Sequence, residues 1–243
     1  MKTTIILFAV LSLVLLVGCE DKVTDPTGAG GFPDIAGIVA FYSFDNTMQD
    51  ATEGGHDATT GTTGLPFVDD HNENVQQAIF VDGVVDTLWV PDHPELDLVG
   101  DVTLAAWIKP QSAMSSYGAV IDKDREVAYS LGITSVTPPD TLAGIKAYIA
   151  GVSYSIGDLV PVGVENWTHI AFSFNDASDR GSFYVNGNFV GSVVKTSSPA
   201  PSDVNLRMGN TIYGDPYVGT LDQVAIIERA LSEVEVGLLY GFD

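Results

Sequence analysis

The stretch Asp122-Lys123-Asp124-Arg125-Glu126 places three carboxylates at the spacing that glycoside-cleaving chemistry requires. On a strand, side chains two positions apart share a face, so these carboxylates could meet one sugar. The same alternation would direct Lys123 and Arg125 to the opposite face, which in a sandwich is the core, and burying unpaired cations is costly. The sequence therefore favours a polar hairpin turn here and not a catalytic strand.

Other residues with catalytic potential form no reactive centre in the sequence. Glu95 and Asp97 are only two carboxylates, in a proline-flanked loop. The four histidines are His56, His71, His93 and His169, and no two of them form the HExxH pair that would bind a metal. There is no Gly-x-Ser-x-Gly elbow and no phosphate-binding GxxxxGK[ST] loop. We therefore predict a protein that is not an enzyme, with a divergent glycoside hydrolase or lyase as an open alternative.

The net charge of the chain limits the classes of partner that it can bind. The chain of 243 residues has 10 Lys and Arg against 32 Asp and Glu, a formal net charge of -22. This charge opposes binding to phosphate backbones and to anionic membrane surfaces, so we predict no nucleic acid partner. The single Cys excludes an internal disulfide and a zinc site built from several thiolates.

That single residue, Cys19, ends an N-terminal export signal. Lys2 precedes an apolar run, residues 5–17, which is shorter than the roughly 20 residues of a membrane-spanning helix and is typical of a signal peptide. The run ends in LVGC, which resembles the bacterial lipobox, where the Cys carries the lipid. A secretory signal with an accidental Cys, or an uncleaved anchor, is the alternative.

We accordingly predict three segments. Residues 1–18 are a lipoprotein signal peptide, residues 19–35 are a flexible acidic tether after lipidated Cys19, and residues 36–243 form one folded domain. The expected location is the outer membrane, with display at the cell surface, and the only membrane attachment is the lipid on Cys19.

The folded part consists of short β-branched and aromatic runs separated by Gly, Pro, Asp or Asn. We expect strands at residues 38–44, 77–81, 84–90, 102–108, 117–121, 127–133, 145–149, 168–174, 181–185, 189–194, 204–208 and 217–227. This pattern indicates an all-β protein, an antiparallel two-sheet sandwich or a barrel.

Two local signals are specific. Asn186-Gly187 can adopt the positive φ angles of a type I′ turn, which predicts a hairpin. Ser232 stands three residues before Glu235, the spacing of a capping box, and predicts one short C-terminal helix from about Glu233 to Tyr240.

Several blocks resemble laminin-G-like, concanavalin A-like jelly-roll domains. Residues 37–45, 54–59 and 78–86 resemble the family's opening, and residues 102–110 (VTLAAWIKP) resemble its "FTISAWVKP" strand. Residues 166–171 (NWTHIA) with 184–187 (YVNG) resemble "WHHVA…LYVNG", and residues 217–232 are similar to "F.G.IDEVRIYNRALS". The resemblance spans residues 36–240 and implies a two-sheet sandwich, but this fold carries lectins, hydrolases, lyases and adhesion modules alike.

The resemblance also implies one structural Ca²⁺, bound by Asp45 with Asp50 nearby and by Asp222. Carboxylates and loop carbonyls are the hard oxygen ligands that Ca²⁺ takes. The alternative is that Asp222 accepts hydrogen bonds from backbone amides and that Asp45 begins a turn.

Sugar binding requires exposed aromatic faces, with amides and carboxylates for the hydroxyls. The candidates lie in polar or Gly-rich surroundings: Tyr148, Tyr154, Asn210, Tyr213, Asp215 and Tyr217. Core packing is the alternative for each Tyr, and we place the three Trp residues in the core. We therefore expect a lipid-anchored cell-envelope module that binds carbohydrate or glycoprotein, with a structural or adhesion domain without glycan binding as the alternative.

Overall fold

The computed structural model describes residues 32–61, 64–83, 87–111, 117–134, 143–160 and 165–242, with the backbone alone for 158–160. The predicted signal peptide, Cys19, most of the tether and part of the predicted strand 84–90 lie outside these residues. Among the described residues, no helix has the length and apolar character needed to cross a bilayer.

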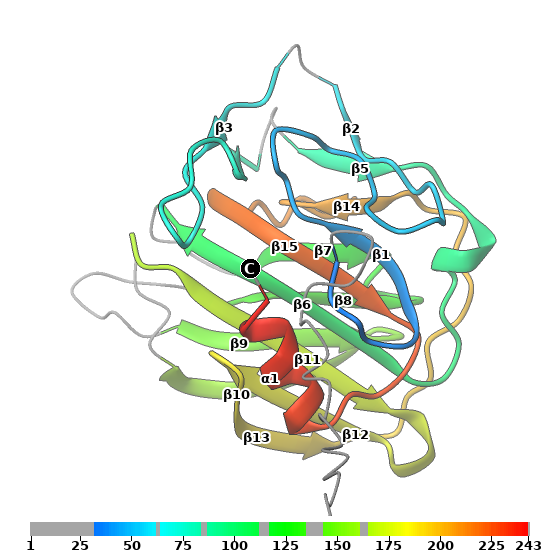
Figure 1. The fold of residues 1–243 in the computed structure, drawn as a ribbon. Coiled ribbons are helices and arrows are strands. Elements are labelled where there is room, and N and C mark those ends of the chain that lie inside the picture. Colours follow the sequence, from blue (N-terminus) through cyan, green and yellow to red (C-terminus); the bar gives the residue numbers. More distant parts are fainter. Residues whose placement is uncertain are drawn as a thin grey trace, which may run out of the picture.

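In the described part of the chain, two antiparallel sheets pack face to face (Figure 1). The first sheet, which we call the covered sheet, contains β1 (Ile38–Tyr42), β3 (Phe67–Val68), β4 (Ala78–Val81), β6 (Val102–Pro110), β11 (Thr168–Asn175), β12 (Arg180–Val185), β13 (Asn188–Val194) and β15 (Gly219–Ile227). The second, the open sheet, contains β2 (Thr59–Thr60), β5 (Leu88–Val90), β7 (Gly118–Lys123), β8 (Tyr129–Ile133), β9 (Ala143–Ile149), β10 (Val152–Val160) and β14 (Leu206–Met208). The predicted two-sheet sandwich is confirmed.

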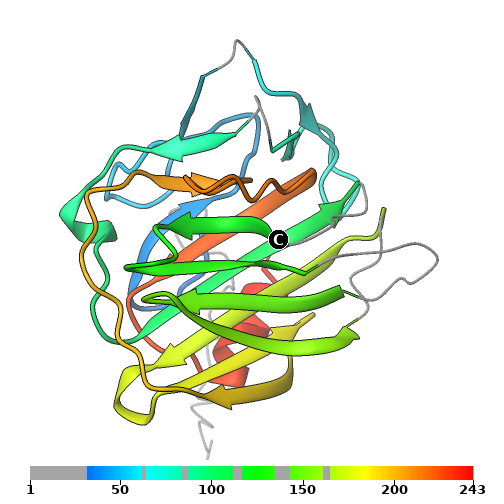
Figure 2. The same cartoon turned by 180° about the vertical axis from the view of Figure 1, so that it is seen from behind.

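The main core lies between the sheets and follows the period-two alternation of each strand. In β9, Ile145, Ala147 and Ile149 are fully buried, whereas Lys146 and Tyr148 point to the outer face and stay partly exposed. Because neighbouring strands pair, their outward residues lie on one face of the open sheet; Figure 2 shows the strands of this sheet from behind.

A second apolar layer covers the outer face of the other sheet, where α1 (Glu233–Tyr240) packs (Figure 1). Val236 and Leu239 of the helix share a buried cluster with Phe41 of β1. Ile35 belongs to the same cluster and Phe32 packs against it, so the predicted tether ends too late. The folded part includes these residues because their apolar side chains find a partner surface.

Both local predictions are confirmed. Helix α1 has the predicted bounds, and its capping box is complete: Glu235 N–H donates to Ser232 Oγ (3.4 Å) and Ser232 N–H donates to Glu235 Oε2 (2.8 Å). At the hairpin between β12 and β13, Asn186 has a φ of 46° and Gly187 a φ of 75°, as a type I′ turn requires.

The sequence analysis missed β2, β3 and β10. In β10, apolar Val152, Tyr154 and Ile156 alternate with serines at 153 and 155. This alternation is typical of a strand, but the serines made the segment look like a polar loop in the sequence. The error mattered because it placed Tyr154 in a loop.

The prediction for residues 122–126 needs a correction. Strand β7 continues through Lys123, whose side chain is fully buried, and only the residues from Asp124 onward form the turn into β8. The Lys123 ammonium group has four oxygen partners: Asp92, Asp97 (3.4 Å) and the carbonyls of Ser202 (2.8 Å) and Val204 (2.7 Å). A buried cation is tolerated here because it is paired, which the sequence could not show.

Candidate functional site

A transverse row of polar and aromatic residues crosses the outer face of the open sheet. It arises because strand pairing aligns one outward position from each strand, while the flanking positions point into the core. The cross-strand partners, in order from β10 to β2, are Ser153, Tyr148, Ser130, Asp122, Arg207, Trp89 and Thr59. We call these seven residues the sheet-face row.

Asp122 stands at the centre of the row and is the most unusual group in it. Its side chain is fully buried, and neither carboxylate oxygen has a hydrogen bond of ordinary geometry among the described residues; the Ser130 hydroxyl and the Arg125 N–H are donors close enough to lower its pKa. The Ser130 hydroxyl next to it donates a hydrogen bond to the Ile121 carbonyl (2.9 Å). Burial raises the pKa of Asp122 to about 7; the Ser130 hydroxyl opposes this rise and the Asp124 carboxylate adds to it.

The β7–β8 turn and residues 210–217 meet beside the row. Arg125 from the turn forms an ion pair with Asp215, and its guanidinium lies 4.8 Å from the ring centre of Tyr213. Tyr213 donates a hydrogen bond from its hydroxyl to Asp124 Oδ1 (2.7 Å), and this contact raises the pKa of Tyr213 to about 12. These contacts hold the turn and the loop together, while Tyr213 itself remains 45% exposed.

Tyr148 connects this assembly to the row. The Arg125 guanidinium lies 5.4 Å from the Tyr148 ring centre and Lys146 Nζ lies 4.7 Å from it. Tyr117 meets the same ring edge to face, with 5.3 Å between ring centres. Aromatic faces, two cations and a carboxylate without a well-formed hydrogen bond thus lie on one sheet face, which is the set of groups that binds neutral, hydroxyl-rich ligands.

Comparison with known protein families decides the classification. Residues 73–237 match the family model described as the Concanavalin A-like lectin/glucanases superfamily. The chain belongs to this family. No curated protein sequence matches the concanavalin A-like chain.

Solved structures agree on the fold. Domain 4 of AbnA, a GH43 extracellular arabinanase from Geobacillus stearothermophilus in complex with arabinotriose, is 20% identical with a TM-score of 0.66, covering 84% of this chain and 98% of that one. The binding domain of Paraclostridial Mosquitocidal Protein 1 is 16% identical with a TM-score of 0.65, covering 84% of this chain. The Botulinum Neurotoxin serotype G binding domain is 12% identical with a TM-score of 0.62 and the same coverage. This chain spans about half the length of the two toxin domains, 52% and 50%.

On this concanavalin A-like fold, the predicted ligand residues divide into two groups. Tyr148, Tyr213 and Asp215 come together at the sheet face, and Asn210 braces the adjoining loop by donating to the Gly83 carbonyl (2.6 Å). The sequence analysis considered Asp122 and Arg125 but assigned them to a polar turn, and it did not name Arg207.

Tyr154 and Tyr217 do not lie on this surface, and for them the ligand-binding prediction is wrong. Both are fully buried in the core between the sheets. Tyr154 hydrogen-bonds Ser197 Oγ (2.7 Å) and Tyr217 donates to the Thr220 carbonyl (3.1 Å), so their polar ends are satisfied internally. Trp89 is the opposite case: we expected it in the core, but it is half-buried on the outer face.

The three predicted calcium ligands do not form a common oxygen cage. The Asp50 carboxylate is occupied by the backbone N–H groups of Phe41, Thr52 and His56 (3.0 to 3.1 Å) and by the Thr52 hydroxyl (2.7 Å). Asp222 is hydrogen-bonded to His71 Nδ1 (2.9 Å) and accepts from the Gln223 N–H (2.7 Å). Burial raises the pKa of Asp222 to about 6, a rise that the contact with His71 opposes.

Among the described residues, the group of potential ligand atoms around Asp222 that lie within 4.8 Å of one another contains Asp70, His71 and Asp222, without Asp45 or Asp50. An imidazole nitrogen on Asp222 is not the oxygen ligand that Ca²⁺ prefers, so these residues as arranged do not fit that ion. Calcium stays a prediction for Asp45, Asp50 and Asp222, which melting with and without EDTA tests.

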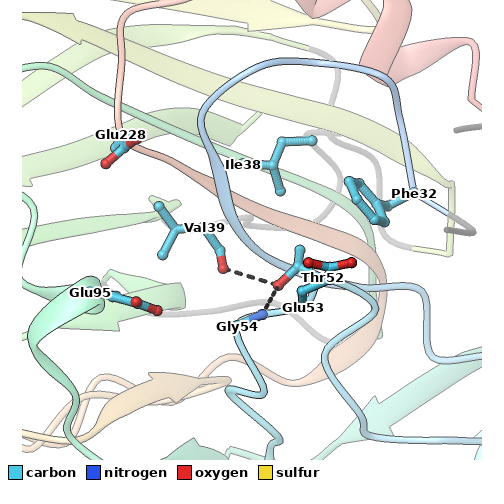
Figure 3. Close-up of a pocket in the computed structure, with 8 residues that line it drawn as sticks. All are labelled: Phe32, Ile38, Val39, Thr52, Glu53, Gly54, Glu95 and Glu228. Carbon is cyan, nitrogen blue, oxygen red and sulfur yellow. Dashed lines mark hydrogen bonds between the residues drawn. The ribbon is translucent and has the colours of Figure 1, made fainter.

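A separate cleft of about 590 Å³ lies beside β1, where the loop after it meets the segment after β5 (Figure 3). Three acidic side chains line it, Glu53, Glu95 and Glu228, and all three are exposed. Glu53 stands across the cleft from Glu95 and Glu228 in Figure 3. The acids therefore line the walls of the cleft and do not converge on one point.

Proposed function

We propose that this chain is a lipid-anchored, non-catalytic module of the bacterial cell envelope that binds carbohydrate, free or on a glycoprotein, on the outer face of the open sheet. The observation that carries the proposal is Asp122, a buried carboxylate without a well-formed hydrogen bond at the centre of the sheet-face row. Leaving such a group unpaired costs free energy, which a ligand that donates to it would recover.

The chemistry around Asp122 suits adjacent sugar hydroxyls. Arg207 on β14 lies opposite Asp122 on β7 in the strand register, and its buried Nε likewise has no acceptor among the described residues. A pair of neighbouring hydroxyls can donate to a carboxylate and accept from a guanidinium at the same time. Tyr213 and Trp89 offer aromatic surface for the C–H faces of the sugar ring.

Access to Asp122 requires the side chains over it to move. Arg125 is 19% exposed and lowers the pKa of Asp122, so it lies near the carboxylate, and a ligand would reach Asp122 by displacing it. That displacement would break the ion pair with Asp215 and the contacts with the rings of Tyr148 and Tyr213, so the ligand has to replace these interactions. The likeness to a domain solved with arabinotriose supports a sugar as the ligand class.

The proposal of a binding module, and not a hydrolase, rests on the acidic residues of the described structure. Glycoside hydrolysis needs two carboxylates about 5 to 9.5 Å apart across one bond, one of them with a raised pKa. Asp122 has a raised pKa, but its neighbour Asp124 is engaged by Tyr213 and by the Ser202 hydroxyl (3.2 Å). A binding role uses Asp122 without requiring a second free carboxylate.

The test is affinity for a panel of neutral oligosaccharides, measured on a glycan array and then by calorimetry. Tyr213→Ala should weaken binding about 10-fold, the loss expected for an exposed aromatic contact worth about 1.4 kcal/mol. Phe189→Ala is the matched control, because Phe189 is 47% exposed on β13 of the covered sheet. Absence of any sugar binding, with recovery of protein partners only, would favour the structural or adhesion alternative.

The anchor is tested separately. The parent chain should incorporate labelled palmitate and Cys19→Ala should not, because the thiol that carries the lipid would be absent. A parent chain without label would remove the lipid anchor from the proposal and leave the sugar site untouched.

A further inference from the structure

Glu95, which lines the cleft beside β1, converges with two histidines, His56 and His93, and none of the three belongs to the sheet-face row. His56 Nε2 lies 3.0 Å from Glu95 Oε2, and His93 Nδ1 lies 3.9 Å from the same oxygen. One potential ligand atom from each residue lies within 4.8 Å of the others. We propose that His56, His93 and Glu95 bind a divalent transition-metal ion, for which Zn²⁺ is the test ion.

The donor set fits Zn²⁺ in type and in spacing. Two imidazole nitrogens and one carboxylate oxygen are ligands that Zn²⁺ prefers, whereas Ca²⁺ takes oxygens. Bond lengths of about 2.0 to 2.2 Å in a tetrahedral site put neighbouring ligand atoms about 3.3 Å apart. The observed 3.0 Å and 3.9 Å lie on either side of that value, so small side-chain rotations would complete the site.

His56 is held in place for this role before any ion binds. Its residue is 4% exposed, its backbone N–H donates to Asp50 Oδ2 (3.1 Å), and its carbonyl accepts from the Tyr42 hydroxyl (2.7 Å). A Cβ on Gly54 would lie 2.8 Å from two atoms of the His56 ring, so the glycine makes room for this ring position. Asp50 thus fixes the backbone of a ligand.

The other two ligands come from one short segment, since Glu95 lies in the 3₁₀ turn η1 (Pro94–Leu96) and His93 is the N-cap residue of that turn. Leu96 is fully buried and its carbonyl accepts from the Tyr129 hydroxyl (2.9 Å), while Lys123 pairs with Asp92 and Asp97 on the two sides of the turn. These contacts hold the backbone of η1 and its flanking residues in place. The side chains of His93 and Glu95 are 49% and 62% exposed, so they remain free to close around an ion.

His93 does have a competing contact. Its Nδ1 accepts a hydrogen bond from the Glu95 N–H at 3.3 Å, the long end of the range for such bonds. A metal bond is much stronger than one long hydrogen bond, and the exposed N–H can turn to water instead. Because Glu95 also lines the cleft, the three protein ligands would leave a coordination position that faces it, open to water or to a further ligand.

Zinc titration of the full chain tests the site, with calorimetry for affinity and Co²⁺ visible absorption for coordination. His93→Gln and Glu95→Gln should each weaken Zn²⁺ binding at least about 100-fold. The loss of a residue that only orients a metal ligand already weakens metal binding about 10- to 100-fold, and these variants remove a ligand itself. Both side chains are exposed, so these variants should fold. Glu53→Gln is the matched control, an exposed acid of the same cleft outside the ligand set, and should bind within about 3-fold of the parent.

Zinc binding that survives in both variants would place the ion elsewhere, for example at Asp70, His71 and Asp222, and would overturn the proposal, as would a parent chain that binds no Zn²⁺. Loss of the Co²⁺ absorption in the variants, with retention in Glu53→Gln, supports it. Sugar affinity of the same variants should be unchanged, so failure here is distinguishable from failure of the sugar site.

Discussion

Replacing Asp122 with Asn should stabilise the protein in mild alkali and weaken its ligand binding. The pKa of the carboxyl is 3.8 in its ordinary state and about 7 in the fold, so the folded state binds the proton more tightly than the unfolded state. The stability that this proton supplies is complete below about pH 4 and is lost as the pH rises through about 7. Three pKa units correspond to about 4 kcal/mol of unfolding free energy.

Asn cannot ionise, so Asp122→Asn removes this pH dependence. Its amide would itself lack partners at a cost of about 1 to 3 kcal/mol, but that cost is the same at every pH. We therefore compare urea unfolding of parent and variant at pH 4.5 and pH 8.5, where the difference between the two ΔΔG values isolates the ionisation. The variant should gain about 2 to 4 kcal/mol relative to the parent between these pH values.

The exposed Asp203→Asn is the control for simple charge removal, and it should show no such change between the two pH values. At pH 8.5, sugar affinity of Asp122→Asn should fall by about 10-fold or more because the acceptor for the ligand's hydroxyls is lost. A pH-dependent gain under 1 kcal/mol would refute the account of the buried carboxylate. Unchanged affinity together with increased stability would show that Asp122 is strained for a reason other than sugar binding.

Three further substitutions separate core, buried-pair and capping roles. Tyr154→Phe should leave sugar affinity unchanged and lower the unfolding free energy by about 1 to 2 kcal/mol, because two internal hydrogen bonds are lost, to the Lys195 carbonyl and to Ser197 Oγ; an affinity loss would return Tyr154 to the site. Lys123→Met should cost about 3 to 5 kcal/mol in urea unfolding, because two carboxylates and two carbonyls lose their shared cation; a neutral result would mean that water replaces it. Ser232→Ala should cost about 1 kcal/mol and lower the melting temperature, since the first turn of α1 loses its cap; no change in melting temperature would mean that packing alone fixes the helix start.

The local features of this protein were predictable because they depend on neighbours in sequence. The Asn186-Gly187 turn requires positive φ at two adjacent residues, and the capping box requires Ser and Glu three positions apart. The strands were largely recognisable for the same reason, since apolar alternation along a few residues is enough to indicate one buried face. Where alternation was short and polar, as in β10, the prediction failed.

The sheet-face row and the histidine pair depended on the tertiary structure. Register between strands decides which outward residues become neighbours, and Asp122 acquires its raised pKa only because strands far apart in sequence bury it. The sequence alone presented Asp122 as part of a charged stretch, and it presented His56 and His93 as isolated residues. Long-range pairing determines which polar groups are desolvated and which ligand atoms meet, and no spacing along the chain encodes that directly.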